Sequence, residues 1–180
     1  MMALAVLGAL GAFALSEDSP AESTILPEIW VIGDSIGVGI ASAMVRANMP
    51  HVSRAIISTT ARQWLTVLRA PDYGSWPQGK RLVVVSLGTN DAQSVELRRE
   101  FISNALAIVA ELRARGHVVC WVLPPSASSL IPQPGDFDRL LEAGATPLWT
   151  RVPMADTWHP TATGYDELAA AIEHLRRNPA

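Results

Sequence analysis

The sequence is short of several residue types, and each shortage excludes a class of protein. Among 180 residues there is one cysteine, Cys120, so an intrachain disulfide and a metal site built from several cysteines are excluded. Cys120 lies in the apolar run VVCWVL, which favours a small core residue over a reactive thiol. Basic residues do not dominate either: 14 Lys and Arg stand against 17 Asp and Glu, a net charge of −3. The chain therefore has no electrostatic footprint for nucleic acid.

The chain also has no apolar run long enough to cross a bilayer as a helix. The N-terminal stretch MMALAVLGALGAFAL is shorter than the roughly 20 residues that a membrane span needs. It is similar to the apolar core of a signal peptide, although no Lys or Arg precedes it. We therefore expect residues 1–27 to be an export segment with a linker, which predicts a secreted or periplasmic protein. The alternative is a cytoplasmic protein whose N-terminal helix packs on the domain formed by residues 28–180.

From residue 28 onward, predicted strands and helices alternate. Apolar, β-branched runs predict strands at 29–32, 53–57, 82–88, 117–123 and 146–152. Amphipathic spacing predicts helices at 37–48, 61–70, 95–116, 137–144 and 161–177. Such alternation favours a parallel sheet with helices on both faces. We expect one three-layer α/β/α domain of flavodoxin-like topology, with about five parallel strands.

Polar residues that can do chemistry follow the predicted strands. Ser35 comes after the first strand in VIGDSIGVGI, and Asn90 comes after the third. Asp156 and His159 follow the last strand. In parallel sheets the ligand site lies beyond the carboxyl ends of the strands, so these side chains should meet at one edge. The two glycines after Ser35 are interpreted as backbone room for the turn into the first helix.

A serine becomes a nucleophile when a base takes its proton and a carboxylate orients that base. Of the four histidines, His159 is the best placed, in the loop DTWHP just before a predicted helix. Asp156 precedes it by three residues, close enough to hold one ring nitrogen while the other points to Ser35. The alternative is that Asp156 merely caps the helix. In the same way, Asn90 of GTND can donate its amide to an oxyanion, or GTND can be a plain turn.

The blocks GDSI (33–36), GTND (88–91) and DTWHP (156–160) together resemble the SGNH hydrolases, or GDSL-like esterases, over residues 29 to 175. The resemblance implies that Ser35 is the nucleophile and also an oxyanion donor through its N–H. It implies that Asn90 is a second oxyanion donor, and that Asp156 and His159 are the orienting acid and the base. The family usually has a glycine after the second strand as a third donor. This chain reads AIISTTARQW there, so the role falls on Ser58, with Thr59 next.

Four other interpretations deserve comparison. GDSIG also matches the nucleophile elbow of α/β-hydrolases, but that fold needs more strands before the serine. A dinucleotide-binding loop lacks its third glycine and its acidic partner. A metal site on Asp34, Asp91, Asp156 and His159 stays open at this stage, although the Ser–His–Asp arrangement explains the same residues more simply. A non-catalytic binding module on the same fold is the alternative outside the enzymes.

We therefore expect a serine ester hydrolase without a metal or other cofactor. Its substrate is predicted to be a small-molecule or carbohydrate ester that carries a short acyl group such as acetyl. A lysophospholipase or a thioesterase for longer chains is the alternative. The side chains expected to contact substrate are Asp34, Arg62, Trp64 and Trp158.

Overall fold

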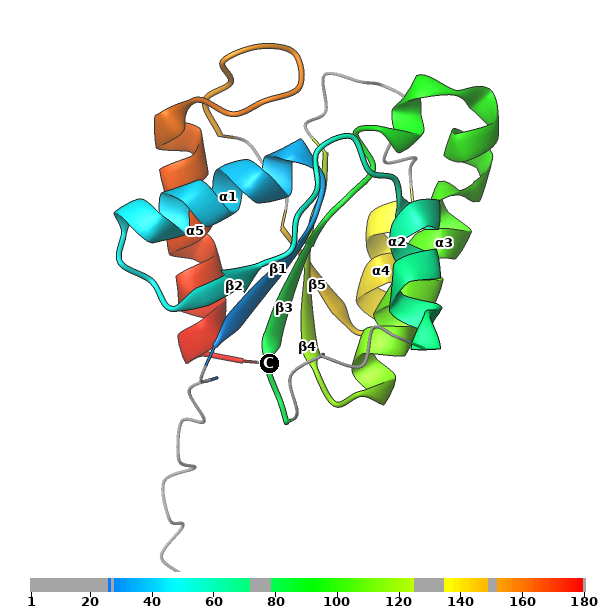
Figure 1. The fold of residues 1–180 in the computed structure, drawn as a ribbon, viewed down its shortest axis with the longest axis horizontal. Coiled ribbons are helices and arrows are strands. Elements are labelled where there is room, and N and C mark those ends of the chain that lie inside the picture. Colours follow the sequence, from blue (N-terminus) through cyan, green and yellow to red (C-terminus); the bar gives the residue numbers. More distant parts are fainter. Residues whose placement is uncertain (1–25, 27, 72–78, 125–134, 149–151, 180) are drawn as a thin grey trace, which may run out of the picture.

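The computed structural model describes Leu26 and residues 28–71, 79–124, 135–148 and 152–179 (Figure 1). The predicted export segment, 1–27, therefore lies outside the described residues except for Leu26, as does most of the Pro- and Ser-rich loop 124–136. Leu26 is buried, and its N–H donates to the carbonyl of Arg176 at 3.1 Å. The chain just before the first strand is thus fixed to the last helix.

A single parallel sheet forms the centre of the molecule. Its five strands stand in the order β2-β1-β3-β4-β5, and each hydrogen-bonded pair is parallel. The bounds are β1 Ile29–Gly33, β2 His51–Ser53, β3 Leu82–Ser86, β4 Val118–Val122 and β5 Ala145–Leu148. The order changes direction at β1, so the loops after β1 and β3 diverge to opposite faces and leave a crevice between them.

Helices cover both faces of the sheet (Figure 1). On one face lie α1 Ser35–Arg46 and α5 Ala162–Arg177. On the other lie α2 Ala61–Arg69, α3 Val95–Ala114 and α4 Asp136–Glu142. A short 3-10 helix, η2 Asp91–Gln93, precedes α3. The predicted three-layer α/β/α fold with five parallel strands is confirmed.

The strands are apolar on both faces because both faces are covered. In β1, Trp30 and Ile32 pack in the core beneath α2, α3 and α4, while Ile29 and Val31 pack in the core beneath α1 and α5. All five residues of β1 and of β3 are buried. This is the reason that their sequences are continuous apolar runs rather than alternating ones.

The predicted second strand, 53–57, was wrong in its bounds. The strand is β2, and its three residues pair with Ile29, Trp30 and Val31 of β1. The N–H groups of Arg54 and Ile56 still donate to the end of β1, but Ile56 and Ile57 are more than half exposed. The β-branched pair belongs to a loop at the sheet edge, where it has no second layer to pack against.

The first helix also differs from its prediction, 37–48. It begins at Ser35, because Asp34 caps it, so Gly37 and Gly39 lie inside the helix rather than in the turn before it. A Cβ on Gly39 would overlap the ring of Tyr165 in α5. The glycine therefore serves the close packing of α1 on α5. Its interpretation as turn backbone was wrong.

The other predicted elements match to within a few residues, with two qualifications. The predicted fifth strand, 146–152, corresponds to β5, and its residues 149–151 lie outside the described part. The long helix α3 ends two residues before Gly116, which has φ +82°. Within the described ranges, no helix is both long enough and apolar enough to cross a membrane.

Candidate active site

Ser35 stands at the point where β1 turns into α1. Gly33 has φ +142°, and the backbone of Ser86 lies so close that no Cβ would fit there. Asp34 follows in extended conformation and accepts the Ile36 N–H at 3.0 Å, which makes it the N-cap of the helix. Ser35 is therefore the first helical residue, where the backbone N–H has no partner within the helix. The Gly-Asp-Ser sequence explains this sharp change from strand to helix.

His159 and Asp156 lie on a tight turn that leads into α5. An antiparallel bridge joins Met154 to Pro160, and the Ala155 N–H donates to the His159 carbonyl at 2.8 Å. One oxygen of Asp156 accepts the N–H groups of Trp158 and His159, each at 2.7 Å. The cap of α5 is Thr161 and not Asp156, so the helix-cap interpretation of Asp156 was wrong.

These three side chains form a connected Ser–His–Asp chain. The Oγ of Ser35 lies 3.1 Å from Nε2 of His159, and Nδ1 of His159 lies 3.0 Å from an oxygen of Asp156. The backbone N–H donors of Trp158 and His159, with the His159 ring, lower the pKa of Asp156. Asp156 is therefore a carboxylate that accepts from Nδ1–H, which leaves Nε2 free to accept the hydroxyl proton of Ser35.

Ser58 lies in the turn between β2 and α2, and its backbone has φ +64°. The turn is closed by the Thr59 N–H, which donates to the Ile56 carbonyl at 3.4 Å. In a turn of this kind the third residue takes positive φ and is usually glycine. Ser58 thus stands in a backbone conformation that favours glycine, at the place where the resemblance leads us to expect one.

A pocket of about 340 Å³ opens over these residues. Ser35, His159, Ser58 and Asn90 line it together, although they come from four separate segments of the chain. Within the described part of the chain, neither the Ser35 N–H nor the Ser58 N–H donates a hydrogen bond. Both N–H groups are thus free to donate to a bound group. The remaining lining residues are Ile57, Thr89, Gln93 and Trp158.

Asn90 is held from two sides. Its amide nitrogen donates to the Thr59 carbonyl at 3.1 Å and to Asp34 Oδ2 at 3.3 Å. Its amide oxygen accepts from the side chain of Gln93 at 3.1 Å, which fixes the orientation of the amide. The NH₂ group therefore faces the Ser58 turn and the Asp34 carboxyl, at the border of the pocket.

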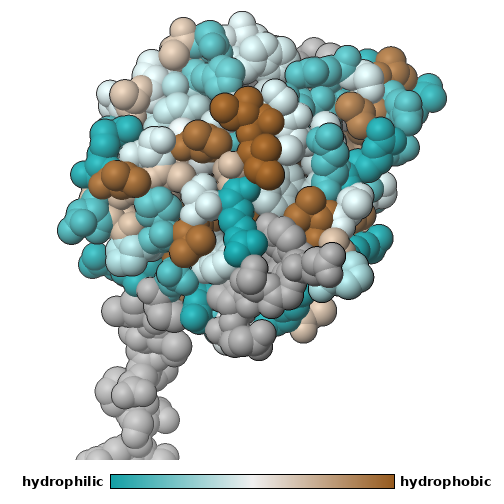
Figure 2. Space-filling view, viewed as in Figure 1, coloured by the Kyte–Doolittle hydropathy of each residue, from teal (hydrophilic) through white to brown (hydrophobic). Residues whose placement is uncertain are grey.

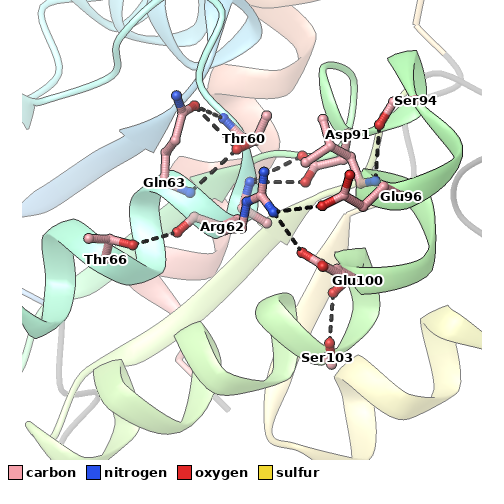
Figure 3. Close-up of polar contacts among 11 residues, drawn as sticks. Thr60, Arg62, Gln63, Thr66, Asp91, Ser94, Glu96, Glu100 and Ser103 are labelled. Atoms are coloured by element: carbon pink, nitrogen blue, oxygen red, sulfur yellow. Dashed lines mark hydrogen bonds and ion pairs between the residues drawn. The ribbon is translucent and has the colours of Figure 1, made fainter.

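Two buried carboxyl groups lie behind the pocket. Burial raises the pKa of Asp34 to about 7, with the neighbouring Asp91 adding to the shift, and burial raises the pKa of Asp91 to about 6. Asp91 accepts the Ala61 N–H with both oxygens, at 3.2 and 3.1 Å, and so stabilises the start of α2 (Figure 3). Thr60 and Gln63 form a capping box at the same helix end. The α2 terminus is thereby attached to the GTND block.

Of the four side chains predicted to contact substrate, only Trp158 lines the pocket. Trp64 is 1% exposed and packs in the core, and Asp34 is fully buried. Arg62 points to α3, where it pairs with Glu96 at 3.2 Å and Glu100 at 3.4 Å (Figure 3). Asp34, Arg62 and Trp64 therefore do not line the pocket, and their roles as substrate contacts stay predictions. Closeness in sequence to a site does not determine which way a side chain on a helix points.

Sequence reasoning missed three lining residues, Ile57, Thr89 and Gln93. Thr89 directly precedes Asn90, and Gln93 follows it by three residues. Their closeness to Asn90 in sequence was a signal that could have found them. Ile57 was predicted to lie in the second strand, but it lies in a loop and is 64% exposed. Among the described residues no three His, Cys, Asp or Glu side chains gather as a metal site. Of the four residues considered for a metal site, Asp34 and Asp91 are buried and accept backbone N–H groups at helix starts. Asp156 and His159 instead form a partly exposed pair.

The sheet order, the two helix layers and the arrangement of the three sequence blocks define the fold of the SGNH hydrolases, or GDSL-like esterases and lipases. Solved structures with this fold include a GDSL-like lipase from Bacteroides thetaiotaomicron, with a TM-score of 0.58 and 18% identity over 83% of this chain and 87% of the lipase. A psychrotrophic esterase from Pseudoalteromonas, inhibited by monoethylphosphonate, has a TM-score of 0.56 and 15% identity, over 82% and 92% of the two chains.

A third structure is a catalytic mutant of an acetylxylan esterase from Geobacillus stearothermophilus. It has a TM-score of 0.59 and 14% identity, over 83% of this chain and 93% of the esterase. No protein-family model and no curated protein sequence matches the chain. At these identities the resemblance inferred from the sequence blocks is confirmed at the level of the fold.

Proposed function

We propose that this chain is a serine ester hydrolase that works through an acyl-enzyme intermediate. The observation that carries the proposal is the continuous contact from Ser35 Oγ to His159 Nε2, at 3.1 Å, and from His159 Nδ1 to Asp156, at 3.0 Å. The fold shared with known esterases and lipases supports it.

In this mechanism His159 takes the proton of Ser35 as the hydroxyl oxygen attacks the ester carbonyl. The charge that develops on the carbonyl oxygen is stabilised by the N–H groups of Ser35 and Ser58 and by the amide of Asn90. The helix dipole at the start of α1 adds to this stabilisation. His159 then protonates the leaving alcohol, and afterwards activates water to release the acid from Ser35.

The Asn90 amide has one donor that can change partner. Its contact with the Thr59 carbonyl is 3.1 Å, whereas its contact with Asp34 is 3.3 Å, beyond the usual range of a strong N–H···O bond. The N–H nearer Asp34 is therefore the one we expect to turn toward the oxyanion. The other keeps Asn90 attached to the Ser58 turn.

The substrate that fits best is an ester with a short acyl group, such as acetyl, on a carbohydrate or similar alcohol. Two observations support this choice. The pocket is small, about 340 Å³, and Ile57 and Trp158 offer it apolar surface beside the polar Thr89 and Gln93. One of the structures with the same fold is an acetylxylan esterase.

The test of the activity is turnover of nitrophenyl acetate by the wild type and by Ser35→Ala. The matched control is Ser42→Ala, an exposed serine on the same helix whose hydroxyl donates to the Val38 carbonyl. We expect Ser42→Ala to match the wild type and Ser35→Ala to lose at least about 10³ in kcat. Wild-type turnover no higher than that of Ser35→Ala would instead support the non-catalytic binding module.

The test of the acyl preference compares acetyl and octanoyl nitrophenyl esters by kcat/KM. We expect the acetyl ester to be the better substrate, because most of the side chains that line the pocket are polar and only Ile57 and Trp158 offer apolar surface to a longer chain. A strong preference for octanoyl would overturn the choice and would favour a lysophospholipase or a thioesterase.

A further inference from the structure

Ser58 adopts a conformation that serine rarely holds without help. Its φ is +64°, in the left-handed region where a Cβ is crowded and glycine is preferred. Among the described residues, Asn48, with φ +53°, is the one other non-glycine at positive φ, and asparagine tolerates that region well. The surroundings of Ser58 must therefore supply the stabilisation that glycine would not need.

Thr59 supplies part of it through its hydroxyl. The Oγ1 atom lies 2.7 Å from the Ile56 carbonyl and 3.0 Å from the Gly33 carbonyl, so its proton binds the turn itself or the end of β1. The same oxygen accepts the indole N–H of Trp64 at 3.0 Å. A single hydroxyl thus joins the turn that contains Ser58 to a strand end and to a buried side chain of α2.

Trp64 and Gly33 complete the attachment. The indole N–H of Trp64 also lies 3.1 Å from the Gly33 carbonyl, which accepts the Ile56 N–H at 2.8 Å as well. Trp64 is 1% exposed and therefore has a fixed orientation in the core. Both ends of the turn, Ile56 and Thr59, are in this way bonded to the residue that directly precedes the Asp34–Ser35 pair.

The carbonyl of Thr59 extends the network to the third oxyanion donor, because it accepts the Asn90 amide at 3.1 Å. Neither Thr59 nor Trp64 lines the pocket. Each can therefore influence a bound ester only through other residues, among which Ser58 and Asn90 line the pocket.

We propose that Thr59 and Trp64 are positioning residues that hold Ser58 in the left-handed conformation, so that its N–H serves as an oxyanion donor without the glycine found at this place in related enzymes. The catalytic part of this inference rests on the proposed ester hydrolysis, whereas the conformational part does not. In this chain, hydrogen bonds then stabilise the positive φ of residue 58, which a glycine would adopt without such help.

The kinetic test introduces Thr59→Val, which removes the hydroxyl at nearly constant volume, into the wild type and into Ser58→Gly. In the wild type we expect kcat for nitrophenyl acetate to fall on the order of 10-fold or more with little change in KM, since a donor used in the transition state is misplaced. In the Ser58→Gly background the loss should be under about 3-fold. Thr59→Ser, which keeps the hydroxyl, should retain activity in both backgrounds.

Two further variants complete the comparison. Trp64→Phe removes the indole N–H together with part of the buried ring, so its effect is compared between the two backgrounds. It should show the same dependence on Ser58 as Thr59→Val. Thr66→Val is the matched control, because the Thr66 hydroxyl donates to the Arg62 carbonyl on the exposed side of α2. It should change kcat in neither background. Equal losses from Thr59→Val in both backgrounds, or no loss in either, would overturn the proposal.

A stability measurement keeps the inference separate from the proposed activity. Ser58→Gly should raise the Tm more in the Thr59→Val background than in the wild type. Without the Thr59 hydroxyl, Ser58 is held less well at positive φ, so replacing it with glycine relieves more strain. An identical Tm shift in the two backgrounds would contradict the role of Thr59 even if the enzyme is active. If the wild type hydrolyses no ester but the Tm shifts differ, the proposed function fails and the conformational role of Thr59 stands.

Discussion

At the scale of single residues, the candidate site combines an exposed Asp–His pair with buried carboxyl groups behind it. Asp156 and His159 keep 58% and 40% of their side-chain surface exposed. Asp34 and Asp91 are fully buried, and each accepts the N–H of a helix start. The first pair can exchange protons with substrate and water. Asp34 and Asp91 stabilise the starts of α1 and α2, which lie beside Ser35, Ser58 and Asn90.

Asn90 offers the sharpest test among the oxyanion donors. Asn90→Ala removes the side-chain donor, and we expect kcat on a nitrophenyl ester to fall by about 10²–10³. Asn178→Ala is the matched control, because this exposed asparagine donates its amide to the His174 carbonyl at the end of α5. It should cost much less. Near-wild-type turnover by folded Asn90→Ala would show that the oxyanion assignment is wrong.

Asp34 should give the protein a characteristic dependence of stability on pH. Its pKa is about 7 in the folded chain against an ordinary 3.8, so the folded state binds the proton more tightly than the unfolded state. The contribution of Asp34 to stability is therefore fully present below about pH 4 and is lost as the pH rises toward 7.

Asp34→Asn cannot ionise and can still cap α1, so it should not show this loss. We expect the free energy of unfolding of Asp34→Asn, relative to the wild type, to increase by about 2–4 kcal/mol between pH 4 and pH 7. Urea unfolding at a series of pH values measures this difference. A difference that stays constant with pH would mean that Asp34 is ionised throughout.

At the scale of elements, the contact between α1 and α5 depends on one glycine. Gly39 lies in the middle of α1, where alanine has the better helix propensity. Its place is explained by the Tyr165 ring, which occupies the space where a Cβ would lie. Since α5 directly follows the turn with His159, this packing also bears on the position of the base.

Gly39→Ala should therefore destabilise the protein by about 1–3 kcal/mol despite the gain in helix propensity. The same substitution in a Tyr165→Leu background should be neutral or stabilising, by up to about 1 kcal/mol. Thermal or urea unfolding of the four variants measures the coupling. Stabilisation by Gly39→Ala in the presence of Tyr165 would show that the ring moves aside without cost.

The elements also show what a sequence can and cannot predict. The buried strands β1, β3 and β4 were predicted well because they are apolar on both faces. The predicted strand 53–57 failed because Ile56 and Ile57 have the β-branched composition of a strand but lie in an exposed loop. The direction of Trp64 also escaped prediction, since its indole meets Gly33, 31 residues earlier in the chain.

At the scale of the whole molecule, the site is assembled from distant parts of the chain. Ser35 and His159 are 124 residues apart in sequence and hydrogen-bonded in space. In Figure 1 the loop that leads into α5, drawn in orange, lies at the same end of the sheet as the loops that follow β1 and β3. The strand–helix alternation was enough to predict this shared edge. The contacts of Thr59 and Trp64 with the Gly33 carbonyl, beside the Ser58 turn, were not predictable, because they join residues far apart in the sequence.

The surface beside this edge is not uniformly polar. Figure 2 shows several brown, hydrophobic groups on the face that carries β2, among polar side chains. Ile56, Ile57 and Val45 are among the most exposed large apolar residues in the described ranges. Ile57 belongs to the pocket wall, so part of this apolar surface is expected to contact the substrate.

The most direct test of the central claim is labelling with a serine-reactive phosphonate, followed by intact mass measurement. A reactive phosphonate labels a serine activated by a base far faster than an ordinary serine. We predict one adduct on the wild type and on Ser42→Ala, and none on Ser35→Ala. An unlabelled wild type, or an equal adduct on Ser35→Ala, would contradict the assignment of Ser35 as the nucleophile of an ester hydrolase.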